Sequence, residues 1–217
     1  VAADGTLSGT AELTGLALVG TTFDLQGTIG GRAGTVTSTV AATRRATVGG
    51  ITVETATARL DATGLSLQAE LAMGPLEGIT ANGTIDDLAS WSLIARSSAT
   101  PWNPISAITT SLVLAGTFHQ SSSALTLDLS ATTTELGALR YDPAPVIALR
   151  FTEVHLANTR GGCAGNVWLR LGGTATLDLF DTTATHDAGG CIDLTTGATS
   201  LSSTFESWAV EFLDGSG

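Results

Sequence analysis

Residues 56–71 read ATARLDATGLSLQAEL, and this stretch decides the fold class. From residue 65 onward, leucine or alanine occupies every second position, and serine, glutamine and glutamate lie between them. Alternation with a period of two predicts a β-strand that has one buried face and one wet face. The Thr63-Gly64 pair that precedes the alternation is typical of a turn. The stretch therefore predicts two strands joined by a turn.

The same alternation recurs in the second half of the chain. It occurs in residues 123–131 (SALTLDLSA), 166–171 (NVWLRL) and 177–179 (LDL). Turn-forming pairs separate such runs at intervals of about 8–12 residues, which is typical of all-β domains. The pairs are Asp4-Gly5, Gly30-Gly31, Gly49-Gly50, Gly74-Pro75, Asn82-Gly83, Gly172-Gly173 and Gly189-Gly190. We predict an all-β fold with almost no helix: an antiparallel, strongly curved sheet, a sandwich or a partly open barrel of roughly a dozen strands.

Two segments depart from this pattern. Residues 86–91 (DDLASW) predict at most a turn or two of helix, with Asp86 as its N-cap. Residues 98–108 contain two prolines and are typical of a long connection. We predict a single β domain over residues 1–217, with residues 98–108 as a linker that subdivides it into residues 1–97 and 109–217.

The composition excludes several classes of protein. Hydrophobic residues make up 43% of the 217 residues and charged residues only 13%, a balance that argues against disorder. The net charge is −11 and every cation is an arginine, so the surface repels phosphate backbones and we expect no nucleic-acid partner. The apolar runs are too short for a membrane-spanning helix. Because the sequence starts at Val1, we expect a mature or trimmed product, with any inner-membrane anchor outside it.

Cys163 and Cys191 are the only cysteines, and each follows a pair of glycines. Two isolated cysteines in an acidic, threonine-rich β chain predict a disulfide; free thiols are the main alternative. A disulfide indicates an oxidising compartment, so we expect a periplasmic or extracellular location.

The sequence offers little catalytic chemistry. The histidines His119, His155 and His186 have no neighbours at zinc-site spacing, and no G-x-S-x-G motif occurs. His186 and Cys191 could form a catalytic or metal site, but a loop histidine beside a disulfide is the more common situation. Trp168 lies on the polar phase of its strand, either as an exposed binding aromatic or, more commonly, as the cover of a second small core. We predict no enzymatic activity, no cofactor and no metal.

The cysteine-containing segments carry a resemblance. Alternating residues 124–131 and 146–156 precede GGCAGNVWLRL (161–171) and GGCIDLTTGATSLSS (189–203). This order is similar to the periplasmic domain of the type II secretion system protein N family, which has two cysteines around a strand and a following hairpin. Residues 76–93 (LEGITANGTIDDLASWSL) resemble AsmA and TamB proteins, which are groove-forming, inner-membrane-anchored β proteins. The resemblance implies a non-enzymatic accessory component of a secretion apparatus and supplies no catalytic residues.

Three functional hypotheses remain. In the first, the chain is an accessory or interaction component of a secretion or envelope machinery, with envelope or secretion-system proteins as partners. In the second, it is a carrier or conduit for a lipid, held in an apolar β groove. The residues that would line this groove are Leu65, Leu67, Leu125, Leu127 and Leu129. In the third, it is a structural protein of the cell surface or matrix.

Overall fold

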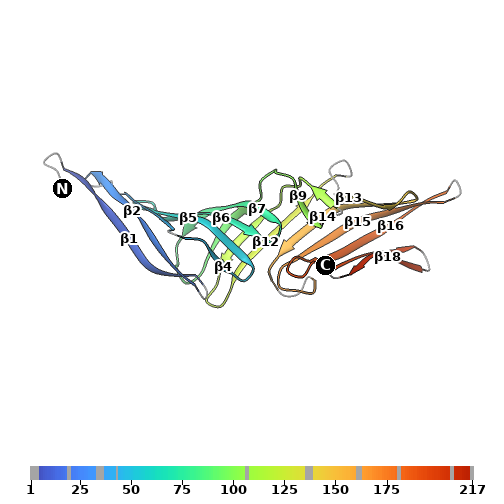
Figure 1. The fold of residues 1–217 in the computed structure, drawn as a ribbon. Helices are drawn as coiled ribbons and strands as arrows, with labels where there is room; N and C mark the ends of the chain where they lie inside the picture. Colours follow the sequence, from blue (N-terminus) through green and yellow to red (C-terminus); the bar gives the residue numbers. More distant parts are fainter. Residues whose placement is uncertain are drawn as a thin grey trace. The chain divides into compact units, whose positions relative to one another are not determined.

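The described residues fold into β-strands joined by turns and loops (Figure 1), as the alternation predicts. The structure, a computed structural model, describes residues 5–18, 21–32, 37–42, 44–105, 108–134, 139–159, 163–179, 182–205 and 208–215. This part of the chain contains eighteen strands and no helix. The strands outnumber the predicted dozen partly because several of them span only three or four residues, too few to show alternation.

The chain forms two compact units. Unit 1 comprises Val1–Met73, Glu77–Arg96 and Thr117–Leu127. Unit 2 comprises Gly74–Leu76, Ser97–Gly116 and Asp128–Gly217. Strands β11 (Ala115–Gln120) and β12 (Leu125–Thr132) contribute residues to both units.

Unit 1 is built on consecutive strands. They are β1 (Thr6–Leu18), β2 (Thr21–Arg32), β3 (Thr37–Ala42), β4 (Ala46–Val48), β5 (Ile51–Asp61), β6 (Gly64–Met73), β7 (Leu76–Ile85) and β8 (Trp91–Arg96). The hydrogen-bonded order is β1-β2-β3-β5-β6-β7-β8, and β4 pairs with β5. Neighbours in sequence pair as antiparallel hairpins, so the order follows from short connections.

The alternating apolar residues of the strands form the core of unit 1. On β8, Trp91, Leu93 and Ala95 are buried, while the residues between them are exposed. Trp91 meets Phe118 edge-on with ring centroids 5.2 Å apart, a favourable aromatic geometry. The core face of the sheet is therefore the one that the apolar phase of the sequence predicts.

Some of the predicted turns are confirmed. Gly49 and Gly50 join β4 to β5 with φ angles of 59° and 81°, and Val48 pairs with Ile51 across them. Positive φ at both central residues is the requirement of a type I′ hairpin, which glycine meets without strain. The Gly74-Pro75 pair likewise separates β6 from β7.

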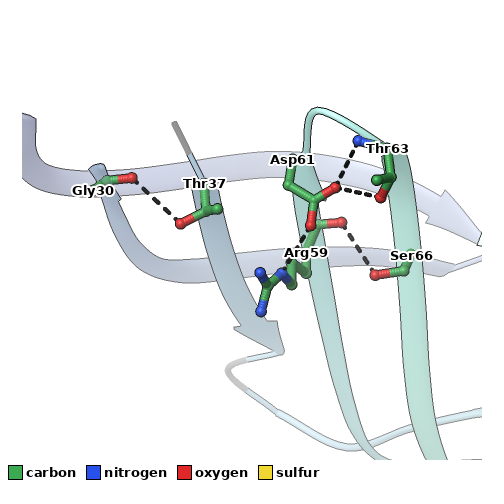
Figure 2. Close-up of polar contacts among 6 residues, drawn as sticks. All are labelled: Gly30, Thr37, Arg59, Asp61, Thr63 and Ser66. Carbon is green, nitrogen blue, oxygen red and sulfur yellow. Dashed lines mark hydrogen bonds and ion pairs between the residues drawn. The ribbon is translucent and has the colours of Figure 1, made fainter. Parts of the chain in front are cut away.

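A side-chain network closes the β5–β6 hairpin (Figure 2). The carboxylate of Asp61 accepts hydrogen bonds from the amide of Thr63 at 2.8 Å and from its hydroxyl at 2.5 Å. Arg59 donates to the same carboxylate at 3.1 Å. These bonds, with that of the Thr63 hydroxyl the largest, lower the pKa of Asp61 below its ordinary value of 3.8.

Four predicted turns are wrong, because the pairs lie inside strands. Gly30-Gly31 lies in β2, Asn82-Gly83 in β7, Gly172-Gly173 in β15 (Trp168–Leu179) and Gly189-Gly190 in β16 (Thr182–Asp193). At Gly173 a Cβ atom would lie 2.0 Å from the carbonyl oxygen of Arg150 on the next strand. Such glycines allow a close approach of two backbones rather than a reversal of the chain. For the pair Asp4-Gly5, Asp4 lies outside the described residues.

The helix predicted over residues 86–91 is also wrong. These residues form a turn, and β8 begins at Trp91. The carboxylate of Asp87, not that of Asp86, accepts a hydrogen bond from the amide of Ala89 at 2.8 Å. Aspartate stabilises such short turns as readily as it caps helices, so its presence alone does not predict a helix.

Unit 2 contains the remaining strands. They are β9 (Trp102–Ile105), β10 (Ile108–Thr110), β13 (Leu139–Ala144), β14 (Ile147–Ala157), β15, β16, β17 (Thr199–Phe205) and β18 (Trp208–Gly215). The order is β12-β14-β15-β16-β17-β18, with β13 on β14 and with β9 and β10 paired separately. Residues 98–108, predicted as a linker, thus include β9 and the first residue of β10.

Candidate functional site: a polar hollow in unit 2

Strands β12, β14 and β15 present a polar row on one face of unit 2. Ser130 lies opposite His155, and His155 lies opposite Arg170. Directly opposed residues point to the same side of a sheet, so these three side chains share a face. The adjacent row, shifted by one residue, is Leu129, Leu156 and Leu169, and all three are fully buried on the other face.

A β-bulge shapes the next part of the polar face. The register shifts between Phe151 and Glu153, so that Gly173 lies opposite Phe151 and Gly172 opposite Glu153. The nearest atoms that a Cβ atom on Gly172 would meet belong to Glu153, with Oε2 at 3.2 Å and Cβ at 3.5 Å. Gly172 therefore has no side chain of its own on this face, and the side chain of Glu153 lies beside it. Bulges often re-aim side chains at functional sites, and this one lies where Glu153 meets Gly172.

The result is a hollow of about 400 Å³ on the surface of unit 2. Its lining comes from β12, β14 and β15 and includes Asp128, Ser130, Glu153, His155, Arg170 and Gly172. Val154 and Leu171 also border it, but their side chains are buried, each with only 2% of the residue exposed. They belong to the opposite face, so their backbone atoms form the floor, and the lining combines polar side chains with apolar surface.

The ring of His155 is held on two sides. Its Nε2 atom lies 2.8 Å from Oδ1 of Asp128. The ring also packs edge-on against Trp168, with centroids 4.9 Å apart and planes at 82°. Trp168 is itself 2% exposed and donates from Nε1 to the carbonyl oxygen of Thr159 at 2.6 Å. Trp168 therefore covers a small second core, and the alternative of an exposed binding aromatic is wrong.

Arg170 and Glu153 carry the charges of the hollow that are not paired with another side chain. Both are exposed, and neither has an ion-pair or hydrogen-bond partner among the residues that the structure describes. Arg150 on the same strand as Glu153 differs, because its guanidinium donates to Asp142 at 2.5 Å. A free guanidinium and a free carboxylate flank Gly172 and can both bind a ligand.

The predicted disulfide between Cys163 and Cys191 is present, with the Cα atoms 5.7 Å apart. Cys191 lies opposite Arg170 in the β15–β16 register, so the bridge lies on the same face as the hollow. The amide of Leu194 donates to the carbonyl oxygen of Val167 at 2.9 Å and fixes the end of the same loop. The face that carries the hollow is thus covalently braced beside it.

The structure buries most of the leucines predicted to line a groove. Leu67, Leu125, Leu127 and Leu129 are each at most 6% exposed, and Leu65 is half-buried. The two strands that carry these leucines, β6 and β12, direct most of them into a core. That these residues line a groove for a ligand stays a prediction.

The other two histidines do not line the hollow. His119 lies near the end of β11. His186 lies inside β16, not in a loop, and pairs with Ala175. It is five positions from Cys191 on the same strand, so the two side chains point to opposite faces. Because Cys191 is bonded to Cys163, it is not a free ligand for a metal.

Sequence reasoning missed the main residues of the hollow. Alternation alone singles out none of Asp128, Glu153 and Arg170. One sequence pattern could have indicated the hollow. Segments 153–155 and 168–170 each place a charged side chain or an imidazole at the polar positions of an alternating strand, beside apolar residues. Which polar phases lie side by side depends on strand order and on the bulge, and neither can be read from alternation.

Ser130 is the hydroxyl-bearing residue that lies opposite His155 in the hollow. Nucleophilic catalysis needs a serine hydroxyl within hydrogen-bond reach of its base. Ser130 faces His155, but in the described part of the chain no hydrogen bond joins them. Within the same described ranges, no group of three histidine, cysteine, aspartate or glutamate residues is arranged to hold a metal ion.

The comparisons with known proteins leave the site to be interpreted on its own geometry. The chain matches no protein-family model, no curated protein and no solved structure. The described residues also include no helix with the length and hydropathy needed to cross a bilayer.

Proposed function

We propose that this chain is a non-enzymatic binding domain that holds a polar ligand in the hollow of unit 2. One observation carries the proposal: the unpartnered side chains of Arg170 and Glu153 line the hollow beside Gly172, which has no side chain. Both side chains project from internal strands whose backbones are fixed by ladders on either side. A rigid scaffold with free hydrogen-bonding groups is what specific binding requires, because little order has to be gained on association.

The proposal includes a location in an oxidising compartment, periplasmic or extracellular. The disulfide supports this location, because such bonds persist where thiols are not kept reduced. The accessory role in a secretion or envelope machinery is also part of the proposal. Its support is the pattern around Cys163 and Cys191, which resembles the type II secretion protein N family.

We propose that the domain has no catalytic activity because of the geometry around His155. Its Nε2 atom is engaged by Asp128, so the carboxylate and the imidazole form a pair without an attached nucleophile. A fluorophosphonate probe, which labels activated serines, should therefore leave the protein unmodified. Labelling of Ser130, abolished by His155→Ala, would contradict this part of the proposal and indicate a hydrolase.

Native mass spectrometry of the gently purified protein tests the binding function. We expect an adduct that is released on denaturation. It should be lost in the double variant Arg170→Gln/Glu153→Gln, because both free charges of the hollow are removed. The matched control is Arg96→Gln on β8, an exposed arginine of unit 1, which should keep the adduct.

Two outcomes would count against this function. A wild-type protein that shows only its apo mass under conditions that preserve the fold would contradict ligand binding. A lipid-sized adduct that persists in the double variant would move the function to the carrier hypothesis and to the leucine faces.

A further inference from the structure

The floor of the hollow continues beyond β15. Gly172 lies directly opposite Gly189 on β16, and Gly189 lies opposite Ser202 on β17. Opposed residues share a face, so two neighbouring positions on the polar face have no side chain at all. The exposed Ser202 follows them in the same row. A row without side chains, which we call the Gly172–Gly189 channel, thus runs from the hollow across β15 and β16.

Side chains of the two flanking rows form the walls of this channel. On one side Arg170 lies opposite Cys191, and on the other side Thr174 lies opposite Asp187. Arg170 and Asp187 are both exposed, so each flanking row carries one charged side chain. A channel of this form suits a linear chain of polar units better than a compact ligand.

The position of the channel limits how a ligand can bind. An extended peptide gains most of its affinity by adding a strand to a free sheet edge. Strands β14, β15 and β16 are internal, and their backbone groups already pair with neighbours on both sides. Side chains are therefore the binding groups on this face, and the ligand must match them.

Those side chains offer donors and acceptors together. Asp128 and Glu153 accept hydrogen bonds, Arg170 donates, and the hydroxyls of Ser130 and Ser202 do both. A sugar hydroxyl also donates and accepts, so a neutral saccharide satisfies carboxylate and guanidinium without placing a new charge in the site. The net charge of −11 disfavours an anionic polymer.

We infer that the ligand of the hollow is a neutral saccharide segment that lies across β14, β15 and β16 along the Gly172–Gly189 channel. This inference rests on the proposed binding function and specifies its ligand class. Glu153 and Asp128 accept from sugar hydroxyls, and Arg170 donates to hydroxyl or ring oxygens. Gly172 and Gly189 let the sugar rings approach the sheet.

Amide NMR of the ¹⁵N-labelled protein with a panel of neutral oligosaccharides, including maltotriose, cellotriose and chitotriose, tests the inference. At least one saccharide should shift the amides of Gly172, Gly189 and Arg170. Its Kd should rise about tenfold or more in Arg170→Gln, which loses a charge-assisted bond. Gly172→Val should weaken binding similarly because its side chain fills the floor.

Matched variants and a second probe distinguish a wrong ligand class from a wrong binding function. Gly30→Val on β2, where a Cβ atom makes an ordinary contact of 3.6 Å with the oxygen of Leu7, and Arg96→Gln should leave the Kd unchanged. Shifts at the channel with triglycine but with no saccharide would overturn the ligand class and leave the binding function standing. Saccharide shifts confined to other residues would overturn the inference, and no shift at the channel with any probe would overturn both.

Discussion

The Nε2 atom of His155 on β14 lies 2.8 Å from Oδ1 of Asp128 on β12, across the pairing of two adjacent strands. The side chains are 30% and 49% exposed, so the pair contributes little to stability by itself. Its effect is to orient the imidazole, which then covers the ring of Trp168. His155 therefore belongs both to the lining of the hollow and to the packing around Trp168.

Replacing His155 tests this shared role. His155→Ala should uncover Trp168, now 2% exposed, and shift its fluorescence emission to longer wavelength because water reaches the indole. Steady-state emission spectra check the result. The shift should disappear when the same substitution is made in a Trp168→Phe background. An unchanged spectrum would show that the loop carrying Thr159, not His155, shields the indole.

The adjacent glycines of β15 should respond differently to the same substitution. Gly173→Ala should lower the free energy of unfolding by about 2 kcal/mol or more, because its methyl group would lie 2.0 Å from the oxygen of Arg150 and force the backbones apart. Gly172→Ala should change it by less than about 1 kcal/mol, since the flexible Glu153 carboxylate at 3.2 Å can move. Urea unfolding measures both. Equal effects of the two substitutions would contradict the geometry of the bulge.

The same glycines explain where sequence reasoning about the fold succeeded and failed. Gly49-Gly50 lies between short apolar runs and forms a turn, whereas Gly172-Gly173 and Gly189-Gly190 lie inside long strands. All three pairs look alike in sequence. A glycine that allows a close cross-strand approach depends on residues far away in the chain, such as Arg150 for Gly173. Alternation, which is local, did predict the strands and their buried faces.

The candidate site shows a second limit of the sequence. The disulfide was predictable because only one pairing of Cys163 and Cys191 exists. The hollow was not, because Asp128, Glu153 and Arg170 come together only through the order β12-β14-β15. That order places β13 off the path, on the other part of β14. No local pattern distinguishes a strand inside the path from one that branches from it.

Removal of the disulfide should destabilise the protein. The double variant Cys163→Ser/Cys191→Ser frees a loop that spans a sequence separation of 28 residues. In the chain-entropy model this costs about 3–4 kcal/mol, because the unfolded chain gains freedom. The urea midpoint should fall accordingly. Ser200→Ala, at the exposed position opposite Cys191 on β17, is the control and should change stability by less than about 0.5 kcal/mol.

Neighbouring residues on β8 provide a test of the alternation. Leu93 is 1% exposed and Ile94 is 71% exposed. Leu93→Ala should cost about 2–5 kcal/mol, because it removes buried methyl groups and leaves a cavity. Ile94→Ala should stay within about 0.5 kcal/mol. Denaturant unfolding of the two variants compares them directly, and a larger loss for Ile94→Ala would show that the strand presents its other face to the core.

The Asp61 turn predicts a defined pH dependence. The Thr63 hydroxyl and amide lower the folded pKa of Asp61 below the ordinary value of 3.8, and the amide of Thr195 does the same for Asp193. A lowered folded pKa gives stability that is present above the unfolded pKa and is lost as the pH falls through the folded pKa. The loss should therefore occur below about pH 4.

The substitution Asp61→Asn should remove the contribution of Asp61 to the pH dependence of stability. At pH 7 the variant should unfold at lower urea than the wild type, and the difference should shrink as the pH falls below 3.8 and through the lowered folded pKa of Asp61, where the wild-type carboxylate becomes protonated. Urea midpoints across this range measure it. In a Thr63→Ala background the difference at pH 7 should shrink, because the hydroxyl is the largest cause of the lowered pKa. A difference that grows on acidification would mean that the carboxylate destabilises the turn.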